Sequence, residues 1–222
     1  MASERPRAAM IMAAGRGERM RPLTDMTPKP LLRVHGQPLI ERHVERLVHA
    51  GIARIVINLA WLGSQIREYL GDGARFGATI TYSEESPRAL DAGGGIFRAL
   101  PHLLPGPFAV VNGDSYTDFP FQTLAIEAKY DSHLVLVPNP SYLQGDFGLE
   151  RGEARAGAAE LFTFGGIAVY RSVFFAGCQD GVFPIMPLWR RSMAAGLCSA
   201  QLYTGPWEDV GTQQRLAALN GV

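Results

Sequence analysis

Residues 13–30 combine glycine, cationic side chains and proline in a pattern suited to binding phosphate. Gly15 and Gly17 follow directly after the apolar run 8–13. Glycine permits backbone conformations closed to other residues and lets main-chain N–H groups approach a ligand. Four cationic side chains belong to the same stretch: Arg16, Arg19, Arg21 and Lys29. Prolines on both sides of Lys29 restrict its backbone, so this lysine can be aimed at a ligand. We expect a polyphosphate-binding loop; the alternative is a glycine turn with solvated arginines.

Two carboxylates stand out further along the chain. Asp114 ends Asn112-Gly113-Asp114, directly after the apolar run 108–111. A carboxylate at the carboxyl end of a central strand is well placed to hold a cation, and Mg²⁺ prefers one or two carboxylates together with waters and substrate phosphates. The alternative is an ordinary Asn-Gly-Asp turn. Asp209, in Trp207-Glu208-Asp209-Val210-Gly211-Thr212, is either a second carboxylate for the same cation or an acidic residue in a turn.

The elements that must position these residues alternate along the first half of the chain. Apolar runs typical of buried strands are followed by amphipathic stretches typical of helices, at 8–13, 38–51, 55–57, 62–70 and 79–82. This order predicts a parallel sheet with helices on its faces, which binds ligands at the carboxyl ends of its strands. We predict an α/β fold, a Rossmann-like three-layer sandwich with a mostly parallel mixed central sheet. One domain over 8–222 is expected, after a disordered N-terminal tail at 1–7.

Composition narrows the class of partner. The 222 residues carry 21 basic and 21 acidic side chains, so no overall field favours nucleic acid or an acidic membrane. No apolar run is long enough for a signal peptide or a membrane span. Cys178 and Cys198 lack Cys-x-x-Cys spacing, and the five histidines show no zinc-type pairing. We therefore expect a cytoplasmic monomer or homodimer that acts on small-molecule substrates and binds neither nucleic acid nor membrane.

The expected phosphate-binding stretch matches neither of two common nucleotide-binding motifs. The P-loop pattern is absent, and the dinucleotide fingerprint lacks its third glycine because Met20 stands there. The stretch resembles instead the signature of the sugar-1-phosphate nucleotidyltransferases, Ala-Ala-Gly-x-Gly-x-Arg-Met-x-Pro-Leu-Thr followed by Pro-Lys-Pro. All of it is present between Ala13 and Pro30, and the segment around Asp209 matches the pattern Trp-x-Asp-Val-Gly-Thr of the same family.

The resemblance implies a nucleotidyltransferase (GT-A-like) fold, magnesium as cofactor, and a role for individual residues. Asp114 and Asp209 would bind the metal, and Lys29 and Arg19 would act on the reacting and leaving phosphates. The residues implied for nucleotide binding are Ala13, Ala14, Gly15, Arg16, Gly17, Glu84, Gly93, Gly94 and Asn112. Those implied on the sugar side are Asn139, Asp146 and Gly166.

Within this family the chain is most similar to the enzymes that transfer a uridylyl group from UTP to N-acetylmuramate 1-phosphate, in the recycling of cell-wall sugars. The likeness rests on segments such as 57–63, Gly-Gly-Gly-Ile-Phe and 139–147. Asp91-Ala92 and Ser115-Tyr116 depart from that pattern near the expected pocket. Mannose or glucose 1-phosphate with GTP, dTTP or UTP is therefore an alternative substrate pair. Alternatives of another class are a non-catalytic nucleotide-sugar sensor and a dinucleotide-dependent enzyme.

Overall fold

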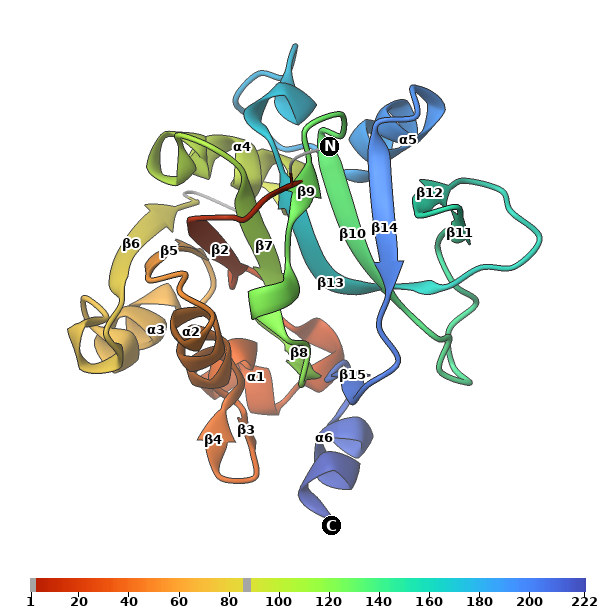
Figure 1. Cartoon of the computed structure of the whole chain (residues 1–222). Coiled ribbons are helices and arrows are strands. Elements are labelled where there is room, and N and C mark those ends of the chain that lie inside the picture. Colours follow the sequence, from red (N-terminus) through yellow and green to blue (C-terminus); the bar gives the residue numbers. More distant parts are fainter. Residues whose placement is uncertain (1–2, 86–88) are drawn as a thin grey trace.

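The computed structural model describes residues 3–85 and 89–222, in which nine strands form one twisted sheet (Figure 1). From edge to edge they are β11 (Gly148–Glu150), β12 (Glu153–Arg155), β14 (Cys198–Leu202), β10 (Ser132–Val137), β13 (Thr163–Tyr170), β7 (Phe108–Asn112), β2 (Ala8–Met12), β5 (Arg54–Leu59) and β6 (Thr79–Glu84). β7, β2, β5 and β6 pair in parallel, whereas β13 runs antiparallel to both of its neighbours. The predicted mixed sheet is confirmed.

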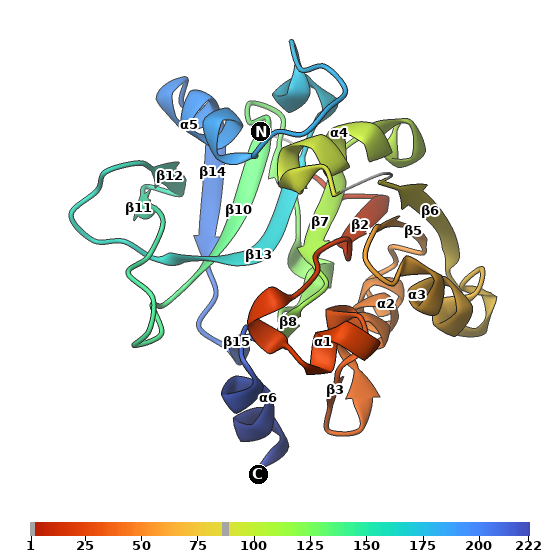
Figure 2. The ribbon, with the colours of Figure 1, turned by 180° about the vertical axis from the view of Figure 1, so that it is seen from behind.

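Helices cover both faces of the sheet. The helices within the described residues are α1 (Leu23–Met26), α2 (Leu39–His49), α3 (Gly63–Leu70), α4 (Asp91–Leu103), α5 (Met186–Ala194) and α6 (Gln213–Asn220). α2 and α3 pack into one core cluster, while α4 and α5 pack into another. Figure 1 views the sheet with α2 in front, and Figure 2 shows the face that carries α4 and α5. None of the described helices is long and apolar enough to cross a membrane.

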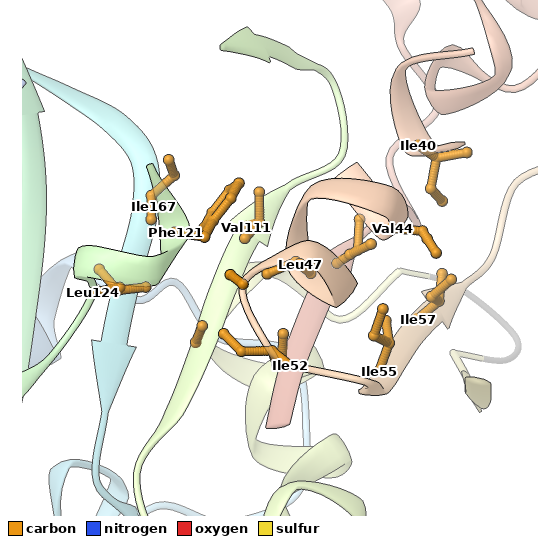
Figure 3. Close-up of a cluster of buried hydrophobic side chains, with 14 of the residues drawn as sticks. Ile40, Val44, Leu47, Ile52, Ile55, Ile57, Val111, Phe121, Leu124 and Ile167 are labelled. Carbon is orange, nitrogen blue, oxygen red and sulfur yellow. The ribbon is translucent and has the colours of Figure 1, made fainter. Parts of the chain in front are cut away.

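Strand β2 shows why the sheet is buried on both sides. Successive side chains of a strand point to opposite faces. Ala9 and Ile11 accordingly join the α2 cluster of Figure 3, while Ala8 and Met10 join the α4 cluster. All four side chains are fully buried. A run that is apolar without alternation is what a strand covered by helices on both faces requires.

Helix α2 forms from the predicted stripe. Its N-cap residue is Pro38, and Ile40, Val44 and Leu47 point into the cluster shown in Figure 3. Gly51 follows with a positive φ of 83°, the backbone conformation in which helices commonly end.

Three small antiparallel pairs complete the fold: β1 (Ser3–Glu4) with β9 (Ile126–Glu127), β3 (Arg33–Val34) with β4 (Gln37–Pro38), and β8 (Ser115–Thr117) with β15 (Trp207–Asp209).

The β1–β9 pair differs from the disordered N-terminal tail that the sequence predicted at residues 1–7. Ser3 and Glu4 pair with β9, and the Glu4 carboxylate accepts a hydrogen bond of 2.9 Å from Arg171. Residues 1–2 lie outside the described residues.

A bulge bends β13 near its start. Its pairing with β10 shifts between Val135 and Leu136, so Gly165 and Gly166 are left without partners in the ladder. Gly166 adopts a positive φ of 74°, a conformation that suits glycine. The indole of Trp207 donates to the Gly165 carbonyl at 2.8 Å. The bulge thereby ties the main sheet to the β8–β15 pair.

Candidate active site

A cavity of about 540 Å³ opens at the carboxyl ends of β2, β5 and β7. Its wall includes most of residues 12–20, Lys29 and Pro30, Asn58, Glu85, Ala89, Asp91 and Ala92, Asn112 and Asp114, and Gly211. Ligands of α/β sheets bind at this edge, so the cavity lies where the strand order predicts it. It brings the glycine-rich stretch, the Asn-Gly-Asp turn and the C-terminal segment together.

One side of the cavity is formed by the glycine loop, which we define as residues 13–17. Gly17 has a φ of 66° and leads into the short helix Glu18–Met20. A Cβ atom at Gly17 would lie 3.0 Å from the Thr24 side chain and 3.2 Å from Lys29, so glycine is required there for both conformation and space. Gly15 is exposed and has no heavy atom within 4 Å of an added Cβ, which leaves its backbone open to a ligand.

Arg16 turns away from the cavity. Its guanidinium lies 4.4 Å from the centroid of the Trp61 ring, and Arg16 is absent from the cavity wall. Trp61 in turn donates to the Thr24 carbonyl at 2.9 Å, and the Thr24 hydroxyl donates to the Gly17 carbonyl at 2.8 Å. The glycine loop is therefore held in place by side chains that lie behind it.

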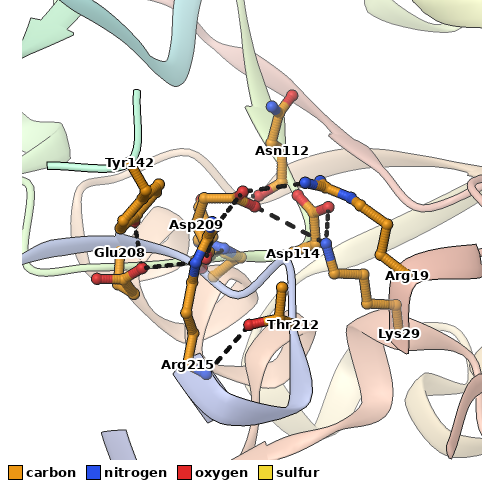
Figure 4. Close-up of polar contacts among 11 residues, drawn as sticks. Arg19, Lys29, Asn112, Asp114, Tyr142, Glu208, Asp209, Thr212 and Arg215 are labelled. Carbon is orange, nitrogen blue, oxygen red and sulfur yellow. Dashed lines mark hydrogen bonds and ion pairs between the residues drawn. The ribbon is translucent and has the colours of Figure 1, made fainter. Parts of the chain in front are cut away.

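Lys29 lies at the centre of the charged groups in Figure 4. Its side chain is only 8% exposed, and its ammonium Nζ lies 2.6 Å from Asp114 Oδ2 and 3.8 Å from Asp209 Oδ1. A buried ammonium is costly unless it is paired, and two carboxylates are available here. The two aspartates predicted as metal ligands therefore converge on one point, together with the predicted lysine.

Backbone pairing explains how Asp209 reaches Asp114 across the chain. Asp209 stands opposite Ser115 in the β8–β15 pair, and the Val210 N–H donates to the Asp114 carbonyl at 3.2 Å. Arg19 Nη2, on the rim of the cavity, lies 3.8 Å from Asp209 Oδ2. The carboxylate of Asp209 is thus bordered by Arg19 and Lys29 on the side that faces the cavity.

These side chains suit a divalent cation. Two carboxylates share the Lys29 ammonium, so the site already accommodates positive charge between them. Mg²⁺ takes one or two carboxylates and fills its remaining positions with waters and substrate phosphates. Within 3–85 and 89–222 no group of three or more His, Cys, Asp or Glu residues is arranged to hold a metal ion. The donor set fits magnesium better than a structural metal enclosed by protein ligands.

Sequence reasoning missed two polar residues on the cavity wall. Asn58 and Glu85 are buried, and the Asn58 amide Nδ2 donates to Glu85 Oε1 at 2.7 Å. Asn58 Oδ1 accepts from the Ala13 N–H at 2.7 Å, and Glu85 Oε2 accepts from the Leu90 N–H at 2.7 Å. Asn58 was recognisable as the polar residue inside the apolar run 55–59. This chain of bonds ties the glycine loop to the start of α4.

Besides Arg16, three further predicted nucleotide contacts, Glu84, Gly93 and Gly94, do not line the cavity. Glu84, one residue before Glu85, is exposed and pairs with Arg67. Gly93 and Gly94 are buried in the first turn of α4, against residues 181–183. A Cβ at Gly93 would lie 2.5 Å from the Phe183 ring, and one at Gly94 would lie 2.1 Å from the Gly181 carbonyl. The glycine run therefore allows close packing of protein against the helix, not of a base or ribose.

None of the three predicted sugar-side residues, Asn139, Asp146 and Gly166, belongs to the cavity wall. Gly166 packs against the side chain of Asn112, a predicted nucleotide contact that does line the cavity, since a Cβ added at Gly166 would lie 3.0 Å from that side chain. The Asn139 amide donates to the Leu161 carbonyl at 2.7 Å, and its oxygen accepts from Thr163 at 3.0 Å. Asp146 Oδ2 accepts from the Phe164 N–H at 2.8 Å. Asn139 and Asp146 thus shape the loop between β10 and β11 and do not line the cavity.

His43 on α2 helps to fix the position of β8, the strand that follows Asp114. It is buried on α2, and burial lowers its pKa to about 4, although the hydrogen bond to Ser115 and the charge of Asp114 oppose the shift. The ring is therefore neutral at pH 7, and Nε2–H donates to the Ser115 carbonyl at 2.8 Å. Through this bond α2 holds β8, the strand that pairs with Asp209.

The glycine loop, the buried Lys29 and the carboxylates of Asp114 and Asp209 thus lie together at the carboxyl edge of the mixed sheet. The chain belongs to the nucleotidyl transferase family, whose model matches residues 8–162. Among curated relatives it is 49% identical to the N-acetylmuramate alpha-1-phosphate uridylyltransferase of Neisseria meningitidis, over 94% of each chain. It is 33% identical to the protein of the same name from Caulobacter vibrioides, over 97% of each.

Solved structures agree on the fold. The inositol-1-phosphate CTP transferase of T. maritima superposes with a TM-score of 0.79 at 15% identity, covering 99% of this chain and 97% of that one. HddC from Yersinia pseudotuberculosis, complexed with GMP-PN, gives a TM-score of 0.77 at 17% identity, covering 96% and 98%. At such identities the likeness concerns the architecture alone, and it agrees with the α/β nucleotidyltransferase fold predicted from the sequence.

Proposed function

We propose that the protein transfers a uridylyl group from UTP to N-acetylmuramate 1-phosphate and releases pyrophosphate. The observation that carries the reaction class is the meeting of Lys29, Asp114 and Asp209 beside the glycine loop. The sugar phosphate and the uridylyl group are taken from the names of the relatives of Neisseria meningitidis and Caulobacter vibrioides, and UTP is the corresponding donor. The reaction belongs to cytoplasmic recycling of cell-wall sugars, carried out by a monomer or homodimer.

The chemistry explains why no general base is needed. The attacking group is a phosphate monoester with a second pKa of about 6, so it is largely ionised at neutral pH. The obstacle is repulsion between two polyanions. Catalysis therefore consists of positioning and of stabilising charge with preorganised groups. The neutral, buried His43 takes no part in proton transfer.

Each charged group has a task that its position supports. Lys29, which is buried and aimed by its two carboxylates, contacts the reacting phosphates. Arg19 and the main chain of Ala14, Gly15 and Gly17 hold the β- and γ-phosphates and stabilise the leaving pyrophosphate. Asp114 and Asp209 would hold Mg²⁺, which would supply further positive charge to offset the repulsion between the phosphates. Asn112 borders the nucleotide, and Gly166, which packs against Asn112, lies on the sugar side.

A substrate panel tests this function. UTP, dTTP, GTP and CTP are each offered with N-acetylmuramate, N-acetylglucosamine, glucose and mannose 1-phosphates, with and without Mg²⁺, and pyrophosphate release is measured. We expect UTP with N-acetylmuramate 1-phosphate to give the highest kcat/KM, and no turnover after chelation with EDTA. A better pair would refute the specific assignment. Binding of nucleotide sugar without pyrophosphate release from any pair would support the non-catalytic sensor.

A further inference from the structure

Asp209 contacts a third cation, which the sequence did not single out. Arg215 Nη1 lies 2.9 Å from Asp209 Oδ2 and 3.2 Å from the carbonyl oxygen of the same residue. Arg19 and Lys29 approach Asp209 only to 3.8 Å. Arg215 is therefore the cation that fixes the carboxylate, because it engages Oδ2 and leaves Oδ1 facing Lys29 (Figure 4).

The position of Arg215 is unfavourable for its own helix. α6 begins after Thr212, whose hydroxyl oxygen accepts from the Arg215 N–H at 3.3 Å, so Arg215 lies in the first turn. The positive end of a helix dipole disfavours a cation there. Asp209 at 2.9 Å and Glu208 at 3.9 Å offset that cost. The segment thus places an arginine where its own helix disfavours the charge and its acidic neighbours stabilise it.

An aromatic ring from a distant loop holds the guanidinium from the other side. The Arg215 guanidinium carbon lies 3.5 Å from the centroid of the Tyr142 ring. The Tyr142 hydroxyl donates to Glu208, which also pairs with Arg215. Tyr142 belongs to the loop between β10 and β11 that carries Asn139 and Asp146. The three side chains of Tyr142, Glu208 and Arg215 therefore join this loop to the candidate metal ligand.

We propose that Arg215 is a positioning residue that orients the Asp209 carboxylate for the divalent cation, and that Tyr142 acts through it. Partners that orient a metal ligand commonly contribute about 10–100-fold to metal affinity or activity. Lysine cannot replace arginine at a site that combines stacking with two hydrogen bonds. The proposal rests on the proposed function only in assuming that Asp209 binds a metal.

Binding of Mn²⁺ to the full-length protein tests the proposal without any substrate. Free Mn²⁺ is measured by its EPR signal for the wild type, Arg215→Met, Arg215→Lys and Tyr142→Ala. We expect the Kd for Mn²⁺ to rise about tenfold in Arg215→Met and almost as much in Arg215→Lys, with a smaller rise in Tyr142→Ala. The matched control is Arg75→Met, since Arg75 lies 4.8 Å from the Tyr69 ring and 3.6 Å from Glu41, away from the cavity.

The double variant that combines Tyr142→Ala with Arg215→Met tests whether Tyr142 acts through Arg215. If Tyr142 acts through Arg215, Tyr142→Ala adds no further weakening of Mn²⁺ binding to Arg215→Met. Additive effects would overturn that link. A wild-type Kd in both Arg215 variants would overturn the proposal itself, as would equal weakening in Arg75→Met. Failure of the substrate panel together with weaker Mn²⁺ binding in Arg215→Met would instead refute the proposed function and leave the positioning role intact.

Discussion

Replacing Lys29 with methionine removes the ammonium group between the two aspartates and keeps the length of the side chain. In the structure this group contacts both Asp114 and Asp209 from a buried position. Without it, two carboxylates face each other and the incoming phosphates with one positive charge fewer. We expect a large effect on catalysis and a small effect on folding, and the two magnitudes follow from different features.

The catalytic loss follows from preorganisation. Removing one preorganised electrostatic contact costs about 10²–10³-fold in kcat, or about 2.7–4 kcal/mol. The loss of stability is smaller because the Asp114 side chain is 36% exposed and solvent screens much of the pair. We expect about 1 kcal/mol, which for a chain of 222 residues lowers the Tm by about 2–4 °C.

Continuous measurement of pyrophosphate release at saturating UTP and Mg²⁺ gives kcat, and calorimetry gives Tm. Lys129→Met is the matched control, because Lys129 is half-exposed and lies against Tyr130, outside the cavity. We expect the control to keep wild-type kcat. A Lys29→Met protein with kcat within about fivefold of wild type would refute the reasoning. Loss of activity that only accompanied unfolding would refute it equally.

Three further predictions concern the pH dependence of stability, thiol reactivity and the glycine loop. Because burial lowers the His43 pKa from 6.5 to about 4, the unfolded chain binds a proton that the folded chain excludes. Stability therefore falls as pH decreases below about 6.5, by about 2 kcal/mol at pH 5. Urea unfolding at pH 7 and pH 5 measures this fall, and His43→Gln should lessen it by that amount; an equal fall in both proteins would contradict the assignment. Burial raises the pKa of the Cys198 thiol to about 12, so Ellman's reagent should modify Cys178 in the folded protein and Cys198 only after denaturation; rapid modification of both thiols would disprove this. Phosphates that draw Arg16 from the Trp61 ring should change tryptophan fluorescence on addition of UTP, and an undiminished change in Trp61→Phe would speak against it.

Patterns local in the sequence predicted the parallel half of the fold and the central charges of the site. Buried strands can be recognised in the sequence as apolar runs. The glycine loop directly follows the first such strand, so it was expected at the carboxyl edge of the sheet. The convergence of Lys29 with Asp114 followed from that topology. The prediction that Asp209 belongs to the site depended on the family motif, because no local sequence pattern indicates that residues 207–209 pair with β8.

Contacts between distant residues were beyond the reach of the sequence. Gly93 and Gly94 fit a ligand pocket and a packed helix equally well, and only the neighbouring segment 181–183 decides between them. Glu84 and Glu85 are adjacent carboxylates, and the end of β6 turns one outward and the other inward. The role of Arg215 depends on Tyr142, which comes from another part of the chain.

The strand β1 was missed for a similar reason. Ser3 and Glu4 have no apolar pattern of their own and are exposed, so their composition predicts a tail. Pairing with β9 and the contact of Glu4 with Arg171 supply order that the segment lacks by itself. Short edge strands of this kind depend on tertiary partners and not on propensity.

The position of the metal tests the central claim most directly. Crystals grown with UDP-N-acetylmuramate and soaked in Mn²⁺ would reveal the ion by its anomalous scattering. We expect one peak bound by carboxylate oxygens of both Asp114 and Asp209, with the Lys29 ammonium on the phosphates of the nucleotide sugar. A nucleotide sugar bound in the cavity with the peak elsewhere, or on only one of these aspartates, would contradict the account.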